Sequence, residues 1–175
     1  MIIELLRHGE PVGGRRYRGN QDDPLSEKGW QQMLDSTQGK SWDYIASSSL
    51  SRCSAFAQHL SDTQNIPLAV FDELIELGFG AWQGKTASEI GQHRVDKFKS
   101  DPLKHRPEGA ENLVDFQARV LSAFDEIIQN NANKTILIVA HAGVIRVIKS
   151  HLHNLALEKM FTIEVKSAAC ERFEI

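Results

Sequence analysis

The fold is decided by a mostly apolar run that ends in two basic residues and a glycine, Ile2-Ile3-Glu4-Leu5-Leu6-Arg7-His8-Gly9-Glu10. A second run of the same kind is Ile136-Leu137-Ile138-Val139-Ala140-His141-Ala142-Gly143. Runs of branched aliphatic residues are typical of buried parallel strands, and open α/β sheets bind ligands just beyond the carboxyl ends of such strands. Because His8 and His141 each follow such a run directly, we expect both imidazoles to line one crevice.

Strand and helix patterns alternate along the rest of the chain. This predicts an α/β fold, a three-layer α/β/α arrangement with a mostly parallel, doubly wound sheet, formed by residues 1–175 as one domain. Further strands are predicted at residues 43–46, 68–71, 160–165 and 170–175, the last two at the sheet edge where antiparallel pairing fits. Helices are predicted after the caps Ser26, Ser47-Ser48-Ser49 and Thr86, the last ending before Asp101, and over residues 113–127 and 144–152.

Composition restricts the partners of the protein. The 20 basic and 23 acidic side chains leave a formal charge of −3, so the chain lacks the positive field of a nucleic-acid or anionic-membrane binder. No apolar stretch approaches the roughly 20 residues that cross a bilayer. The two cysteines, Cys53 and Cys170, are too few for a disulfide framework. We therefore expect a soluble cytoplasmic protein that binds a small molecule, with no nucleic acid, no membrane and an open oligomeric state.

The residues around the two histidines suit phosphoryl transfer. A phosphate monoester repels anionic nucleophiles, whereas a neutral imidazole attacks phosphorus without that penalty. His8 is the candidate nucleophile, and Arg7 and Arg52 are candidates for holding the phosphoryl oxygens, Arg52 from the first turn of the helix after Ser49. His141 is expected to donate to a phosphoryl oxygen, beside the N–H groups of the helix that it precedes.

Each of these residues also has a purely structural interpretation. His8 and His141 can be buried histidines bonded to backbone carbonyls, and Arg52 can be a solvated helix residue. Arg7 beside His8 favours function, because an unpaired buried arginine is costly. His151 and His153 form a His-x-His pair, but no Asp or Cys lies nearby at a zinc-site spacing, so no metal is expected there.

Four ordered motifs carry a resemblance to a known family. They are Leu5-Leu6-Arg7-His8-Gly9-Glu10, Ser51-Arg52, Leu74-Ile75-Glu76 and Val139-Ala140-His141-Ala142-Gly143. The chain resembles the histidine phosphatase superfamily, the phosphoglycerate mutase-like proteins, over nearly its whole length. The resemblance implies a phosphohistidine on His8 without metal or cofactor, and Glu76 as the general acid that later activates water. Glu73 is the rival carboxylate, and Glu76 taken alone is more often a surface loop residue.

The resemblance also marks weaker candidates and departures. Asn112, in a segment that resembles the pocket-lining part of the family, and Arg18, beside Gly19, are candidate substrate contacts. Family members often carry a threonine and an asparagine after the first motif, where this chain has Pro11-Val12-Gly13-Gly14. Ala140 stands where serine is frequent, which predicts that a hydroxyl near His141 is missing.

The resemblance is compatible with three hypotheses about the function. A mutase must shield its phosphohistidine from water, and this short chain has little sequence for a lid, which favours hydrolysis. Tyr17-Arg18-Gly19 and the segment 160–165 are similar to α-ribazole-5'-phosphate phosphatases of cobalamin synthesis, which implies α-ribazole 5'-phosphate or a similar small ester as substrate. A phosphoglycerate-type mutase or broad-specificity phosphatase is the alternative. A phosphate-binding module without activity is the third reading, and the presence of all four core residues argues against it.

Overall fold

Five strands form one sheet in the computed structural model, which describes residues 1–175. The strands are β1 (Ile2–Arg7), β2 (Tyr44–Ser48), β3 (Leu68–Phe71), β4 (Thr135–Ala140) and β5 (Cys170–Glu174). Their order is β3-β2-β4-β1-β5, with β1 to β4 mutually parallel and β5 antiparallel to β1. Because β4 lies between β1 and β2, the carboxyl ends of these three strands meet at one edge of the sheet.

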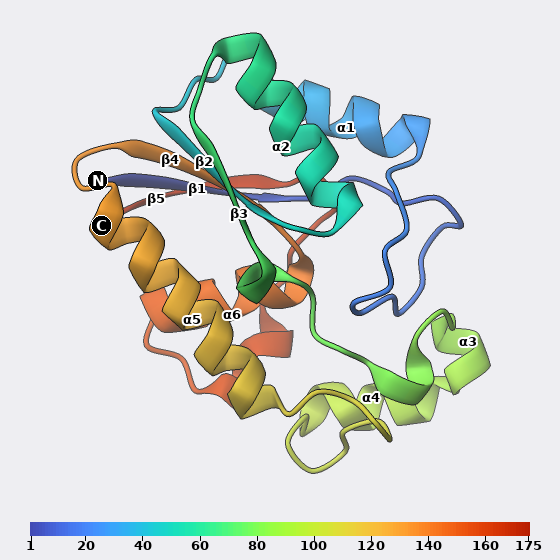
Figure 1. Ribbon diagram of the computed structural model, residues 1–175. Helices are drawn as coiled ribbons and strands as arrows, with labels where there is room; N and C mark the ends of the chain where they lie inside the picture. Colours follow the sequence, from blue (N-terminus) through green and yellow to red (C-terminus); the bar gives the residue numbers. More distant parts are fainter.

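Helices cover both faces of the sheet, which gives the three layers expected from the sequence (Figure 1). They are α1 (Glu27–Thr37), α2 (Ser51–Gln64), α3 (Ala87–Ile90), α4 (Gln92–Ser100), α5 (Leu113–Asn130) and α6 (Ala142–Leu152). In Figure 1, α1 and α2 lie above the sheet, α5 and α6 below it, and α3 and α4 lower still, away from the strands. Three short 3-10 helices are also present: η1 (Asp72–Leu74), η2 (Gly80–Trp82) and η3 (Leu157–Thr162). None of the helices has the length and apolar composition needed to span a bilayer.

The core divides between the two faces because successive strand residues point to opposite sides. On β1, Ile3 and Leu5 are buried in the cluster that includes α5 and α6, while Leu6 packs with α1 and α2. Full burial of such a side chain contributes about 1.5–3 kcal/mol. Packing on both faces holds β1 and β4 in a fixed register, in which Arg7 lies opposite Ala140.

Several local expectations are confirmed and others are wrong. Ser26 caps α1 by accepting from the Gly29 N–H at 3.0 Å, as its position predicted. The serines before α2 do not cap it: Ser47 and Ser48 belong to β2, and the N-cap residue is Leu50, which has no side-chain bond. The helix expected from Thr86 has the predicted capping box, but Gly91, with φ at +96°, interrupts it and separates α3 from α4.

The strand expected at residues 160–165 does not form. Met160 to Thr162 end the 3-10 helix η3, and no strand follows until β5. The physical reason is that the segment makes core and side-chain contacts in place of strand pairing. Met160 is buried in the core, and the carbonyls of Ile163 and Val165 accept hydrogen bonds from arginine side chains instead of strand partners.

Candidate active site

The two histidines lie side by side at the carboxyl ends of β1 and β4. The backbone N–H of His8 donates to the carbonyl of Ala140 at 3.0 Å, so the parallel pairing continues to the residue before His141. The two ring centroids are 5.1 Å apart, with 62° between the ring planes. The structure therefore brings both imidazoles into one site, although 133 positions, the difference of their residue numbers, separate them in the chain.

The ring of His8 is held in one orientation and kept neutral. Its Nδ1 lies 2.7 Å from the Gly9 carbonyl oxygen, which requires the proton on Nδ1 and leaves a lone pair on Nε2. Burial, followed by the positive charges of Arg52 and Arg7, lowers the pKa of His8 to about 3. At neutral pH the ring is consequently uncharged and carries the nitrogen lone pair that a nucleophile needs.

His141 is the N-cap residue of α6 and is fully buried. Burial and the nearby charges hold its pKa well below the ordinary range. The expectation that a hydroxyl would be missing near this ring is wrong, because Ser48 Oγ, from β2, lies 2.8 Å from Nε2. The Cys53 thiol is also close, with Sγ 3.6 Å from Nε2.

Arg52 is a buried cation and Arg7 a partly buried one, and both donate their hydrogen bonds to the backbone. Arg7 Nη1 donates to the Val165 carbonyl at 2.7 Å, and Arg52 donates to the carbonyls of Gln21 at 2.6 Å and Gly19 at 2.8 Å. The Nε–H groups of both arginines are buried without a protein acceptor. Burial lowers the pKa of each guanidinium. An anion at this position would offset the cost of desolvating two like charges.

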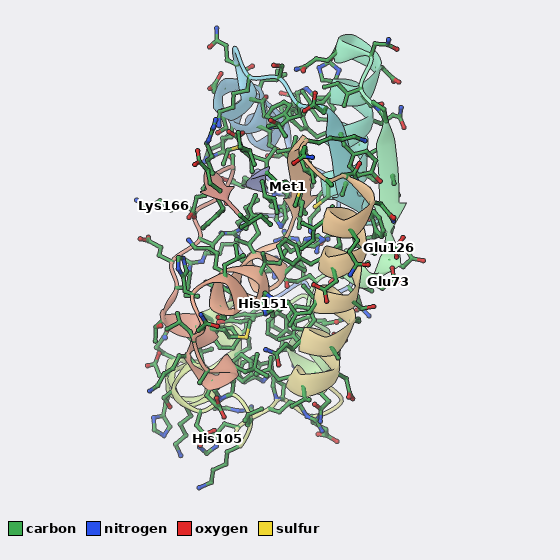
Figure 2. All side chains as sticks on the ribbon, turned by 90° about the vertical axis from the view of Figure 1, so that its left-hand side faces the viewer. Met1, Glu73, His105, Glu126, His151 and Lys166 are labelled. Atoms are coloured by element: carbon green, nitrogen blue, oxygen red, sulfur yellow. The ribbon has the colours of Figure 1, made fainter.

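Glu76 places its carboxylate at the N-terminus of α6. Its Oε2 accepts from the Gly143 N–H at 3.1 Å, and Oε1 accepts from the Leu77 N–H at 2.9 Å. The charge of Glu76 raises the pKa of both Arg7 and Arg52, although burial outweighs it. The rival Glu73 is exposed at the surface beside α5 (Figure 2). Of the two carboxylates, Glu76 is therefore the one that shares the site with the histidines.

Gly143 leaves the space that the Glu76 carboxylate fills, since a Cβ at position 143 would overlap Oε1. Alanine favours helix more than glycine does, so Gly143→Ala is expected to keep the fold while displacing Glu76. We expect kcat/KM to fall about 10- to 100-fold, less than the roughly 10²- to 10⁴-fold that an acid–base group contributes, because Glu76 is displaced and not removed. A double-mutant cycle checks the cause: in a Glu76→Ala background the same change should cost nothing further, and full additivity would contradict the explanation.

The weaker candidates have structural bonds of their own. Arg18 is 7% exposed and donates from Nε to Asp23 at 2.8 Å and from Nη2 to the Val12 carbonyl at 2.7 Å. Its charge contributes to the lowered pKa of His8, so it lies near the site while holding the loop after β1. Asn112 is exposed and caps α5, its Oδ1 accepting from the N–H groups of Val114 and Asp115. That oxygen is engaged in the cap.

The remaining histidines lie outside this constellation. The rings of His151 and His153 are next to Phe124 and Phe173, and no group of three or more His, Cys, Asp or Glu side chains suited to a metal ion is found. His105 lies at the end of the molecule opposite α1 and α2 (Figure 2).

Sequence reasoning missed two polar residues near the site. Ser48 was interpreted only as a helix cap, although three serines directly after a strand could have indicated a hydroxyl at the strand end. Arg146 lies one turn after Gly143 on α6, donates from Nε to the Ile163 carbonyl at 3.0 Å, and packs over Phe161. Burial lowers the pKa of Arg146, while the charge of Glu76 raises it. The sequence signal that could have found Arg146 is its position as a single cation within the apolar stripe of the predicted helix.

The two buried imidazoles make the stability of the protein depend on pH. Unfolded histidine binds a proton below a pH of about 6.5, whereas His8 has a folded-state pKa of about 3 and that of His141 is also strongly lowered. The unfolded state therefore binds more protons, and the free energy of unfolding should fall by about 1 kcal/mol per pH unit per histidine between pH 6 and 4. Urea unfolding at several pH values measures the slope. His8→Asn should reduce this slope by about 1 kcal/mol per pH unit, the contribution of one histidine. The control His151→Asn, at an exposed position, should leave the slope unchanged. Equal slopes in all three proteins would contradict the assignment.

The fold and the site together define the class of this protein. The chain belongs to the histidine phosphatase superfamily (branch 1), whose family model matches residues 3–175. The members of this family are phosphatases or mutases. The alignment with the family therefore includes both histidine motifs, Arg52 and Glu76.

Relatives and solved structures agree with this membership. The Bifunctional protein Rv2228c of Mycobacterium tuberculosis is 32% identical over 164 residues, which cover 82% of this chain and 42% of that protein, so the chain spans less than half of its length. The adenosylcobalamin/alpha-ribazole phosphatase of Escherichia coli is 24% identical over 183 residues, covering 100% of this chain and 90% of the relative. The structure of Bacillus stearothermophilus YhfR superposes with a TM-score of 0.89 at 28% identity, covering 99% of this chain and 91% of the other.

Proposed function

We propose that this protein is a metal-independent phosphatase that hydrolyses a small phosphate monoester through a phosphohistidine on His8, with α-ribazole 5'-phosphate as the specific substrate. The observation that carries the proposal is the state of the His8 ring. Its Nδ1 proton is engaged by the Gly9 carbonyl, its pKa is lowered to about 3, and its neighbour His141 is 5.1 Å away. A neutral imidazole with a free Nε2 is the nucleophile that attack on a phosphate dianion requires.

The two arginines supply the positive charge for this reaction. Arg7 and Arg52 both act on His8 electrostatically, and each has a buried Nε–H without a protein acceptor. The charge of the two guanidinium groups is suited to the equatorial oxygens of the transferring phosphoryl group, on which charge develops in the transition state. His141 donates to a further phosphoryl oxygen, and the N-terminal N–H groups of α6 add a favourable dipole.

Glu76 serves as acid and then as base. In the first step Nε2 of His8 forms a bond to phosphorus, the phosphorus–oxygen bond to the alcohol breaks, and the Glu76 carboxyl gives its proton to the departing alkoxide. In the second step the Glu76 carboxylate takes a proton from water as that water attacks phosphorus. The nitrogen–phosphorus bond breaks, inorganic phosphate leaves, and His8 is neutral again.

We propose the pocket beside Glu76 for the alcohol part of the substrate. A pocket of about 390 Å³ is lined there by residues that are mainly polar: Asn20, Ile75, Glu76, Gly78, Gly80, Gln83, Gly109, Glu111 and Arg119. The choice of α-ribazole 5'-phosphate rests on the full-length match to the Escherichia coli relative named for that activity. With this substrate the protein acts in cobalamin synthesis.

A phosphatase screen tests the proposal. Small phosphate esters, including α-ribazole 5'-phosphate and 3-phosphoglycerate, are offered with EDTA present, and free phosphate is measured. We expect hydrolysis to survive chelation and kcat/KM to be highest for α-ribazole 5'-phosphate. Transfer of phosphate to an added acceptor alcohol would instead identify a mutase, binding without turnover would identify a phosphate-binding module, and a different preferred ester would overturn the specific substrate.

A further inference from the structure

One arginine on α5 is bonded to the backbone that carries Glu76. Arg119 Nη1 donates to the carbonyls of Glu73 at 2.6 Å and Ile75 at 2.9 Å, and Nη2 lies 3.4 Å from the carbonyl of Glu76 itself. Apart from the short 3-10 helix η1, this stretch has no regular structure to stabilise it. The guanidinium thus replaces the missing backbone partners of the segment that leads into Glu76.

Glu111 completes the arrangement from the other side of Glu76. Its two carboxylate oxygens accept from Arg119 Nε at 2.7 Å and Nη2 at 2.9 Å, a bidentate pair. The same carboxylate accepts from the Gly78 N–H at 3.1 Å, and the Glu111 N–H donates to the Gly78 carbonyl at 2.9 Å. The ion pair therefore fixes the backbone both before and after Glu76.

The other end of this arrangement is α6. Glu76 accepts a hydrogen bond there from the Gly143 N–H. The helix that carries Arg119, α5, packs against α6 in the same core cluster. The Phe116 ring lies under the guanidinium, 4.7 Å from ring centroid to Cζ, and is itself buried in that cluster. The position of the Glu76 carboxylate is consequently tied to the packed helices α5 and α6 and not to its loop alone.

We infer that Arg119 and Glu111 are positioning residues that hold Glu76 where it transfers its proton to the leaving group. The inference rests on the proposed role of Glu76 as general acid. The pair is only partly exposed, 21% for Arg119 and 24% for Glu111, and its bidentate geometry restricts the side chains more than a single contact would. Loss of the pair should therefore affect the step that needs the acid more than the steps that do not.

The test compares two aryl phosphates whose leaving groups differ in basicity, phenyl phosphate and 4-nitrophenyl phosphate. The nitrophenolate leaves without protonation, whereas phenolate needs a proton from Glu76. The measured quantity is kcat/KM, which reports on formation of the phosphohistidine. We expect Arg119→Gln to lower kcat/KM for phenyl phosphate about 10- to 100-fold, and that for 4-nitrophenyl phosphate by a few-fold at most, in the pattern of Glu76→Gln. Arg119→Lys cannot bond the carboxylate and the carbonyls at the same time. Its kcat/KM for phenyl phosphate should therefore lie between that of Arg119→Gln and that of the unchanged protein.

Controls separate the inference from a general loss of structure. Arg94→Gln, at an exposed position on α4, should leave both substrates unaffected. In a Glu76→Gln background, Arg119→Gln should have no further selective effect on phenyl phosphate. If Arg119→Gln does not fold, Glu111→Gln, which keeps an acceptor oxygen but loses the charge, carries the same comparison.

Failure of the inference is distinguishable from failure of the proposed function. Equal losses on both substrates in Glu76→Gln would refute Glu76 as the acid, and the inference would fall with it. Selective loss in Glu76→Gln together with equal losses, or none, in the Arg119 and Glu111 variants would overturn only the positioning role.

Discussion

Replacing His8 with alanine is expected to stop turnover, with kcat falling by about 10⁴-fold or more, because the proposed covalent intermediate forms on Nε2 of this ring. The ring is buried and neutral, and its one polar bond is to the Gly9 carbonyl of the next residue. The fold should survive its removal. Rapid mixing of 4-nitrophenyl phosphate with the protein, followed by quenching in base, should trap an acid-labile, base-stable phosphorylated protein that His8→Ala does not form.

The matched control for this variant is His151→Ala, which removes an exposed histidine on α6. It should form the phosphorylated protein at the normal rate. Turnover by His8→Ala above one part in a hundred of the normal rate, or trapping of phosphate on another residue, would show that the nucleophile lies elsewhere.

Arg52→Ala should have the second largest effect, lowering kcat about 10³-fold, in the range found for arginines that stabilise phosphoryl transition states. Arg52→Lys should recover only part of this loss, because an ammonium keeps the charge but not the planar fork of donors. Binding of inorganic phosphate offers a second measurement. Phosphate should raise the Tm of the unchanged protein and of Arg52→Lys more than that of Arg52→Ala.

Arg52→Ala also leaves the carbonyls of Gly19 and Gln21 without their donor, so its free energy of unfolding has to be measured beside its activity. Arg94→Ala serves as the matched exposed control. A well-folded Arg52→Ala protein with normal kcat and a normal phosphate-induced rise in Tm would contradict a role for Arg52 at the phosphoryl group.

The sequence allowed the parts of the fold that follow local patterns to be predicted. The strands before His8 and His141 are uninterrupted aliphatic runs, and residues at the carboxyl ends of adjacent parallel strands must lie close together, so the meeting of the two imidazoles followed from topology. That prediction needed only periodicity and the rule for strand ends. Arg52 does lie in the first turn of α2, although the serine caps from which its position was predicted do not form.

The remaining features depend on contacts between distant segments, which no local pattern encodes. The 160–165 segment has strand composition, but its carbonyls accept hydrogen bonds from Arg7 and Arg146 in place of a neighbouring strand. The bond between Ser48 and His141 joins residues 93 positions apart. Arg119 lies beside the buried stripe of α5 and donates to backbone carbonyls of a loop more than 40 positions earlier in the chain.

The bond between Arg7 and the Val165 carbonyl ties the chemistry of the first strand to residues near the end of the chain. Val165 is buried, and β5, which follows it, pairs along nearly all of β1. If β5 and the residues before it detach from β1, the guanidinium of Arg7 loses this acceptor while His8 remains at the end of its strand. The position of the proposed phosphate-binding cation thus depends on the docking of residues 165–174.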